Sequence, residues 1–314
     1  MILPEKKLWT PSRRELLKGA GAALASGGWS RGNQNYLNWL WWHFKPTDTN
    51  LFCFSSTNGG TTWASRTCNY TPRSGTIVRD PNALPLVDQQ NVVIAYTSDT
   101  FGVSTTSFDI CRNTDAACKN FSYLATIDTS SIVSGANARS WGPRWVWYAG
   151  NLYVTIACSA NGDNGPFQLY YAQVLDLVNF SSIGPWQQIT GTGLPSSMFD
   201  NDIFPYGAQW LMFVKNELNG KFIEVAQSNN PFSGYSMIRT GNWAGFGTPR
   251  EGEYVNRMSA SQWWIILDAQ GSGYTRSNST SDDPTGSWGA PFSMTTPYTP
   301  QNGKNILCPG WVVP

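Results

Sequence analysis

The sequence predicts an all-β fold, a single five-bladed β-propeller. Short segments rich in β-branched and aromatic residues occur at 92–97, 152–157, 210–214 and 263–267. Clusters of Gly, Asn, Asp and Pro separate these segments, as turns separate strands. No convincing long amphipathic helix pattern appears after residue 30. The third observation is a repeat of about 55–60 residues, which is typical of propeller blades.

The repeat consists of a polar turn that is closed by an aromatic residue. The closing aromatics are Trp63, Phe121, Phe180, Tyr235 and Trp288, which are separated by steps of 58, 59, 55 and 53 residues. A polar turn followed by an aromatic suits a tight outer hairpin whose last strand packs its ring on the blade. Five such hairpins at regular spacing predict five blades.

A second series runs at the same period and predicts how the ring closes. Asp80, Trp141, Asp200 and Glu251 each precede a strand-turn-strand pattern, at steps of 61, 59 and 51 residues. Four blades would then follow in sequence order. The fifth would combine a C-terminal strand, residues 306–313, with N-terminal strands around residues 37–63. Pairing the two chain ends closes the ring without leaving an exposed sheet edge.

The composition excludes some classes of function. Charged residues make up 13% of the 314-residue chain, and the net charge is +1. A nucleic-acid-binding protein would need a basic stripe, so no nucleic-acid partner is expected. The chain contains 16 Trp, 13 Tyr and 15 Phe. These rings fit a β-rich core, and some of them also fit stacking against sugar faces.

The first residues predict export. Residues 12–18, with Arg13 and Arg14, resemble a twin-arginine signal, and Ala23 and Ala25 frame a small-residue cleavage site. The alternative is a chance basic start to a short helix. We expect a signal at 1–25, a linker at 26–36 and one catalytic propeller domain at 37–314, in the periplasm or outside the cell. No later segment offers the roughly 18 apolar residues of a membrane span.

The cysteines allow disulfides but not an evident metal site. The six cysteines show no Cys-x-x-Cys spacing, and His43 is the single histidine, so we expect no metal and no cofactor. An oxidising compartment permits disulfides, and six cysteines allow 15 pairings. The local spacing favours Cys53 with Cys68 and Cys111 with Cys118.

The order of four motifs resembles glycoside hydrolase family 43, the arabinanase and arabinofuranosidase-type propellers. The motifs are Arg79-Asp80-Pro81, the Trp-Gly-Pro-Arg-Trp of residues 141–145, Phe199-Asp200, and Arg250-Glu251-Gly252. The resemblance covers about residues 50–314. Each motif alone is weak, whereas their order, their spacing and the five hairpins together are more specific.

Three positions depart from the family pattern. Arg144 replaces an expected acidic residue, and Glu253 stands where the family usually has proline. The Arg-His-Gly of the fifth blade is replaced by Cys308-Pro309-Gly310. The absent histidine puts in doubt the central metal site of some relatives, and the subfamily stays open.

The resemblance implies hydrolysis of glycosidic bonds by three carboxylates. Asp80 would be the general base, Glu251 the general acid, and Asp200 would orient the acid and tune its pKa. An inverting enzyme separates its two carboxyls by roughly 6.5–9.5 Å so that a water fits between them. The alternative for Asp80 and Asp200 is that they cap turns before strands. Glu253 is the rival of Glu251, because residues two apart on a strand share a side.

The substrate would be an arabinose- or xylose-containing plant-type polysaccharide or oligosaccharide. Trp141 is the preferred stacking platform, and Arg79, Arg144 and Trp145 are the further candidates for substrate binding. A non-catalytic carbohydrate-binding propeller is the first alternative. A sialidase-like hydrolase is the second, because residues 56–63 resemble an Asp-box hairpin.

Overall fold

A computed structural model describes residues 39–45, 48–85, 91–98, 103–259, 261–270, 273–297 and 306–307. The predicted export signal and linker lie outside these residues, as do Cys308, Pro309 and Gly310. The described residues form strands, turns and one short 3-10 helix, η1 (Gly162–Asn164). The predicted all-β class is confirmed.

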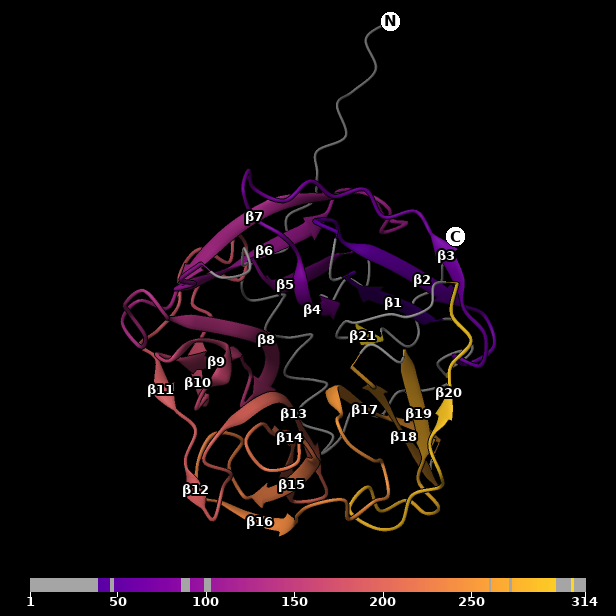
Figure 1. Cartoon of the computed structure of the whole chain (residues 1–314). Helices are drawn as coiled ribbons and strands as arrows, with labels where there is room; N and C mark the ends of the chain where they lie inside the picture. Colours follow the sequence, from indigo (N-terminus) through magenta and orange to yellow (C-terminus); the bar gives the residue numbers. More distant parts are fainter. Residues whose placement is uncertain are drawn as a thin grey trace, which may run out of the picture.

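Five sheets lie around a common centre, and each forms one blade (Figure 1). Blade 1 contains β1 (Trp39–His43), β2 (Phe52–Ser56), β3 (Ala64–Arg66) and β21 (Ile306–Leu307). Blade 2 contains β4 (Arg79–Pro85), β5 (Val92–Thr97), β6 (Ser107–Asn113) and β7 (Phe121–Asp128). Blade 3 contains β8 (Arg139–Tyr148), β9 (Asn151–Ser159), β10 (Gln168–Gln173) and β11 (Gln187–Gln188). Blade 4 contains β12 (Gly191–Thr192), β13 (Met198–Tyr206), β14 (Gln209–Asn216), β15 (Ile223–Ser228) and β16 (Tyr235–Arg239). Blade 5 contains β17 (Glu251–Ser259), β18 (Gln262–Asp268), β19 (Tyr274–Asn278) and β20 (Phe292–Ser293).

The predicted closure of the ring is confirmed. The C-terminal β21 pairs antiparallel with the N-terminal β1, with Trp41 opposite Leu307 and Trp42 opposite Ile306. Strands β4, β8, β13, β17 and β21 lie nearest the centre in Figure 1. The five sheets do not match the six blades that a sialidase-like protein would have.

The core lies between the blades, in five clusters that each join neighbouring sheets. Strand β5 shows how one strand contributes to two clusters, because successive side chains on a strand point to opposite faces of the sheet. Ile94 and Tyr96 pack toward blade 1, whereas Val93 and Ala95 pack toward blade 3. Both faces of a blade are therefore covered, which explains why the predicted strands read as continuous apolar runs.

Many of the tryptophans belong to this core. The cluster between blades 1 and 5 contains Trp39, Trp41, Trp63 and Trp264. Trp41 contacts Trp63 edge to face, with ring centroids 4.9 Å apart. Each buried aromatic removes roughly 150–250 Å² from water, so this seam holds blades 1 and 5 together by apolar burial.

The outer hairpins confirm the predicted repeat. Each has an Asn or Asp whose side-chain oxygen accepts a backbone N–H from within the same turn, at 2.6–3.0 Å. These residues are Asn58, Asp115, Asp176, Asn230 and Asp283. All five closing aromatics are buried. The turn chemistry and the ring packing together make each hairpin compact.

The innermost strands of blades 2 to 5 share a β-bulge, which corrects the predicted alignment of the blades. A register shift follows Arg79, Trp141, Phe199 and Glu251 in turn. The bulge residue has a positive φ in each strand: Asp80 (+48°), Gly142 (+65°), Asp200 (+48°) and Gly252 (+60°). Trp141 and Glu251 therefore lie one residue before the positions equivalent to Asp80 and Asp200. The sequence repeat concealed this, because Asp and Gly both tolerate positive φ.

The predicted disulfide pairs are not formed, since the five described cysteines are free. The strand register gives the reason. Cys53 lies opposite Arg66 in the β2–β3 pair, and Cys111 lies opposite Tyr123 in the β6–β7 pair, so the spacing along each hairpin does not align the cysteines across it. Cys53, Cys68, Cys111 and Cys118 nevertheless share the cluster between blades 1 and 2.

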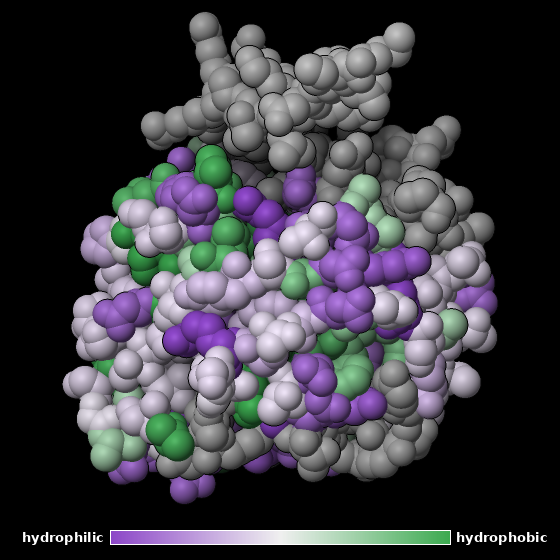
Figure 2. Space-filling model, turned by 90° about the horizontal axis from the view of Figure 1, so that it is seen from above, coloured by the Kyte–Doolittle hydropathy of each residue, from purple (hydrophilic) through white to green (hydrophobic). Residues whose placement is uncertain are grey.

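Figure 2 shows one side of the molecule, where hydrophobic residues form separate patches among hydrophilic ones. Over the described part of the chain, no helix has the length and apolar character needed to span a membrane.

Candidate functional site

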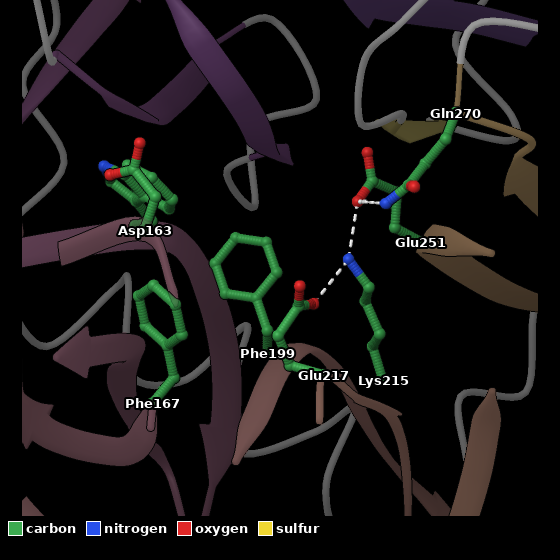
Figure 3. Close-up of a pocket in the computed structure, with 8 residues that line it drawn as sticks. Asp163, Phe167, Phe199, Lys215, Glu217, Glu251 and Gln270 are labelled. Carbon is green, nitrogen blue, oxygen red and sulfur yellow. Dashed lines mark hydrogen bonds and ion pairs between the residues drawn. The ribbon is translucent and has the colours of Figure 1, made fainter. Parts of the chain in front are cut away.

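A pocket of about 110 Å³ lies where the inner strands of blades 3, 4 and 5 approach one another (Figure 3). Its lining residues are Trp141, Asp163, Phe167, Phe199, Lys215, Glu217, Glu251 and Gln270. Trp141, Phe199 and Glu251 hold the same place in three successive blades, directly before the bulge. The bulge therefore delivers three equivalent side chains to one pocket.

The polar side of the pocket centres on Glu251, whose side chain is 25% exposed. Lys215 Nζ lies 2.7 Å from Glu251 Oε2, and Gln270 Nε2 donates to the same oxygen at 2.7 Å. Lys215 also pairs with Glu217 Oε2 at 2.6 Å, and Lys221 reaches Glu217 from the other side at 3.3 Å. Lys215 thus lies between two carboxylates, as Figure 3 shows.

Lys215 is a buried cation, with 2% of its side chain exposed. Burial lowers the pKa of Lys215. The Glu251 and Glu217 carboxylates together raise this pKa by more than burial lowers it, so the net shift is upward. Lys215 therefore keeps its charge at neutral pH.

Asp200 is buried and lies directly behind the Glu251 segment. Its Oδ2 accepts the backbone N–H of Gly252 at 2.7 Å. This bond links blade 4 to blade 5 beside the predicted acid. The sequence expectation that Asp200 acts next to Glu251 agrees with this contact, but Asp200 does not line the pocket.

Asp80 makes the corresponding link between blades 2 and 3 through a threonine. Thr97 Oγ1 donates to Asp80 Oδ2 at 3.0 Å and accepts the N–H of Gly142 at 2.9 Å. Asp80 is half-buried and is not part of the pocket lining.

Asp80 and Asp200 both adopt a left-handed backbone, where two sister blades use glycine. Outside glycine this conformation costs of order 1 kcal/mol. Because aspartate is less favourable than glycine in this conformation, each carboxylate serves a purpose, either in the chemistry of the site or in the inter-blade bonds just described.

Two of the three departures from the family pattern meet in space. Arg144 Nη2 donates to the backbone carbonyl of Glu253 at 3.2 Å, and both side chains are buried. Burial raises the pKa of Glu253 well above its ordinary value, although the Arg144 charge opposes the shift. Burial likewise raises the pKa of the neighbouring Asp202 to about 6, again against Arg144. Arg144 is thus the cation of a buried cluster with Asp202 and Glu253.

Glu253, the rival of Glu251, therefore lies in a different environment. It is fully buried beside Arg144, whereas Glu251 reaches the pocket. This favours Glu251 as the residue that meets a ligand.

The predicted substrate-binding residues divide into two groups. Trp141 lines the pocket and stacks on Phe167, with ring centroids 5.5 Å apart. Arg79 is buried and its Nη1 donates to the carbonyls of Lys45, Asp48 and Val78.

Trp145 packs between blades, where its Nε1 donates to the Asn82 carbonyl at 2.9 Å. Arg144 belongs to the buried cluster described above. Substrate binding by Arg79, Arg144 and Trp145 stays a prediction, since their described contacts are with the protein itself.

Sequence reasoning missed Lys215, Glu217 and Gln270. A signal was available for two of them. Lys215 and Glu217 follow the apolar strand at 210–214 and are two residues apart, as residues on one side of a strand are. Gln270 follows β18, and its φ of +44° is unusual for a residue other than glycine.

Among the described residues, no three His, Cys, Asp or Glu side chains are grouped as ligands for a metal ion. Burial lowers the pKa of His43 to about 3, against its bond with the Trp41 carbonyl. His43 is therefore a neutral core residue. The expectation of a site without metal stays a prediction.

The sequence matches no protein-family model and no curated protein. Solved structures, however, share the fold. One is the family 43 enzyme (GH43_1) from Xanthomonas citri complexed with xylose, with a TM-score of 0.51, 13% identity, and coverage of 71% of this chain and 76% of that one. This chain shares its fold with that family 43 enzyme.

Two further structures extend the likeness. A family 43 β-1,3-galactosidase with galactodeoxynojirimycin has a TM-score of 0.53 at 10% identity, covering 71% of this chain and 79% of its own. The catalytic domain of a family 62 α-L-arabinofuranosidase from Coprinopsis cinerea has a TM-score of 0.51 at 15% identity, covering 71% of each chain. The resemblance that the motifs indicated is confirmed for the fold, at low identity.

Proposed function

We propose that this chain is a glycoside hydrolase. The observation that carries the proposal is the position of the three acids on the inner strands. Glu251 lines the pocket, Asp200 bonds the residue after it, and Asp80 has the same bulge position as Asp200 two blades away. Proteins of this fold include a family 43 enzyme complexed with xylose, a β-1,3-galactosidase and an α-L-arabinofuranosidase. Arabinose- or xylose-containing plant-type glycans are the substrates we propose.

The reaction we propose is a single displacement with inversion. Asp80 removes a proton from water, which attacks the anomeric carbon, while Glu251 protonates the departing oxygen. Asp200 holds the Glu251 segment through Gly252. Trp141 offers an indole beside the pocket for the apolar face of a sugar.

The first test is hydrolysis of aryl glycosides of arabino, xylo and galacto configuration. We expect the arabinoside or the xyloside to be cleaved faster than the galactoside, and the first-formed sugar to carry the inverted anomeric configuration in proton NMR. A retained anomer would mean a covalent intermediate on a carboxylate, and it would contradict the roles given to Asp80 and Glu251.

A carbohydrate-binding propeller without turnover is the second candidate. The Lys215–Glu251 ion pair at 2.7 Å favours it, because a general acid has to carry a proton and an ammonium group beside a carboxylate favours its ionised form. Sugar binding by calorimetry, combined with no hydrolysis of any of the glycosides, would support this function instead.

We also propose that the chain is exported. The motivation is Arg13-Arg14 followed by an Ala-x-Ala site at residues 23–25. Replacing both arginines by lysine should leave the protein in the cytoplasm, as measured by cell fractionation. Unchanged export of the lysine variant would show that residues 1–25 are not a twin-arginine signal.

A further inference from the structure

Both contacts of the Glu251 carboxylate, within the described residues, fall on the same oxygen. Lys215 Nζ and Gln270 Nε2 each lie 2.7 Å from Oε2. An ammonium and an amide NH₂ group donate only. Oε2 is therefore an acceptor of two hydrogen bonds, and Oε1 is the oxygen left to carry a proton. Figure 3 shows Lys215 and Gln270 approaching Glu251 from different directions.

The supporting side chains are themselves held in place. Lys215 is 2% exposed and is bound by Glu217 as well as by Glu251. The Gln270 N–H donates to Asp268 Oδ1 at 2.8 Å, which anchors a residue whose φ is +44°. The two donors thus have little freedom to move away from Oε2.

We propose that Lys215 is a positioning residue for Glu251, which holds Oε2, leaves Oε1 to donate the proton, and sets the upper pH limit of activity. The inference deepens the proposed function and rests on it. In the step itself, the Oε1–H bond breaks, the proton bonds to the departing glycosidic oxygen, and Glu251 becomes a carboxylate. The positive charge of Lys215 stabilises the carboxylate that this step produces.

The positive charge of Lys215 aids proton transfer to the leaving group, but at high pH it should limit activity. A cation beside a carboxyl group favours the loss of its proton, so Lys215 should also narrow the pH range of activity. Other charged groups also lie around this site. These are Glu217, beside Lys215, with Lys221 beyond it, Asp200 and Asp202 from β13, Arg144 from β8, Arg250 and Glu253 next to Glu251 in sequence, Asp268 opposite it on β18, and Asp163 across the pocket.

The decisive variant is Lys215→Met, which keeps most of the side-chain volume and removes the charge. We expect the alkaline limb of the kcat/KM profile to move up by about one pH unit or more. We expect kcat at the optimum to fall roughly 10- to 100-fold for a substrate with a poor leaving group, because Oε1 is less well aimed. An aryl glycoside with a very good leaving group needs little protonation and should lose much less.

Three matched variants separate this role from a structural one. Lys215→Arg keeps the charge, so its alkaline limb should stay at the pH of the unsubstituted protein. Arg257→Met removes a half-exposed cation that pairs with Asp282 on the surface, and it should leave the profile unchanged. Lys215→Met combined with Glu217→Gln removes both partners of the buried pair, so it provides a foldable background if the single variant proves unstable. An unmoved alkaline limb in a folded Lys215→Met protein would overturn the proposal.

A second measurement distinguishes this inference from the proposed function. Carbon-13 NMR of the glutamate carboxyls, with Glu251→Gln as the assignment variant, follows Glu251 without any substrate. In Lys215→Met the Glu251 titration should move to higher pH. A moved titration in a protein that hydrolyses nothing would sink the proposed function alone, whereas an active enzyme with an unmoved titration would sink the role of Lys215.

Discussion

Asp80→Asn and Glu251→Gln should each lower turnover by about 10²–10⁴-fold and leave the fold intact. This is the usual contribution of a general base or acid. Asn and Gln keep an oxygen that can accept the existing bonds, from Thr97 in one case and from Lys215 and Gln270 in the other. The loss would therefore report the missing proton transfer. Steady-state kinetics on the best aryl glycoside, together with circular dichroism, measure both properties.

The leaving group separates the two roles. A very good leaving group departs without protonation, so it should rescue Glu251→Gln far more than Asp80→Asn. Asp282→Asn is the matched control, because it changes an exposed carboxylate that pairs with Arg257 on the surface and should leave turnover unchanged. Near-normal turnover in Asp80→Asn would mean that Asp80 has only a structural role, through its bond with Thr97, which links two blades.

The fold could be predicted from sequence because each blade repeats the same local chemistry. The turn residues such as Asp176, and aromatics such as Phe180, act within one hairpin and leave a visible period. The alignment of the inner strands was wrong by one residue at Trp141 and Glu251. That error arose because the repeated feature is a backbone conformation, which Asp80 and Gly252 satisfy with different side chains.

The site was harder to predict because its parts meet only across blades. Glu251 could be found, since its motif is local. Lys215 and Gln270 reach it from β14 and from the end of β18, and no spacing along the chain marks that meeting. Residues 144 and 253 lie far apart in the sequence, and only the structure shows that Arg144 bonds to the backbone carbonyl of Glu253.

Arg144→Met should destabilise the protein by an amount that grows with pH. Arg144 is the buried cation whose charge opposes those of Asp202 and Glu253, and leaving buried charges without an opposing charge typically costs about 3–5 kcal/mol. Asp202 and Glu253 have raised pKa values in the folded state, so the folded protein holds protons that the unfolded chain releases. Such groups contribute stability that is fully present below the unfolded pKa and is lost as the pH rises through the folded one. Removing Arg144 raises both folded pKa values further, so the loss should be small near pH 4 and largest near pH 8.

Urea unfolding at several pH values measures this effect, and two further variants identify its cause. Glu253→Gln keeps the shape and removes a group that has to take up a proton on folding, so alone it should raise stability near pH 8 and flatten the pH dependence. Combined with Arg144→Met and Asp202→Asn, it should recover most of the lost stability, because no buried charge is then left without its partner. Arg257→Met is the control, since its pair with Asp282 is half-exposed and a surface pair is worth about 0–1 kcal/mol. A loss in Arg144→Met that is the same at pH 4 and pH 8 would show that Arg144 acts by packing, and the charge cluster would then have no part in stability.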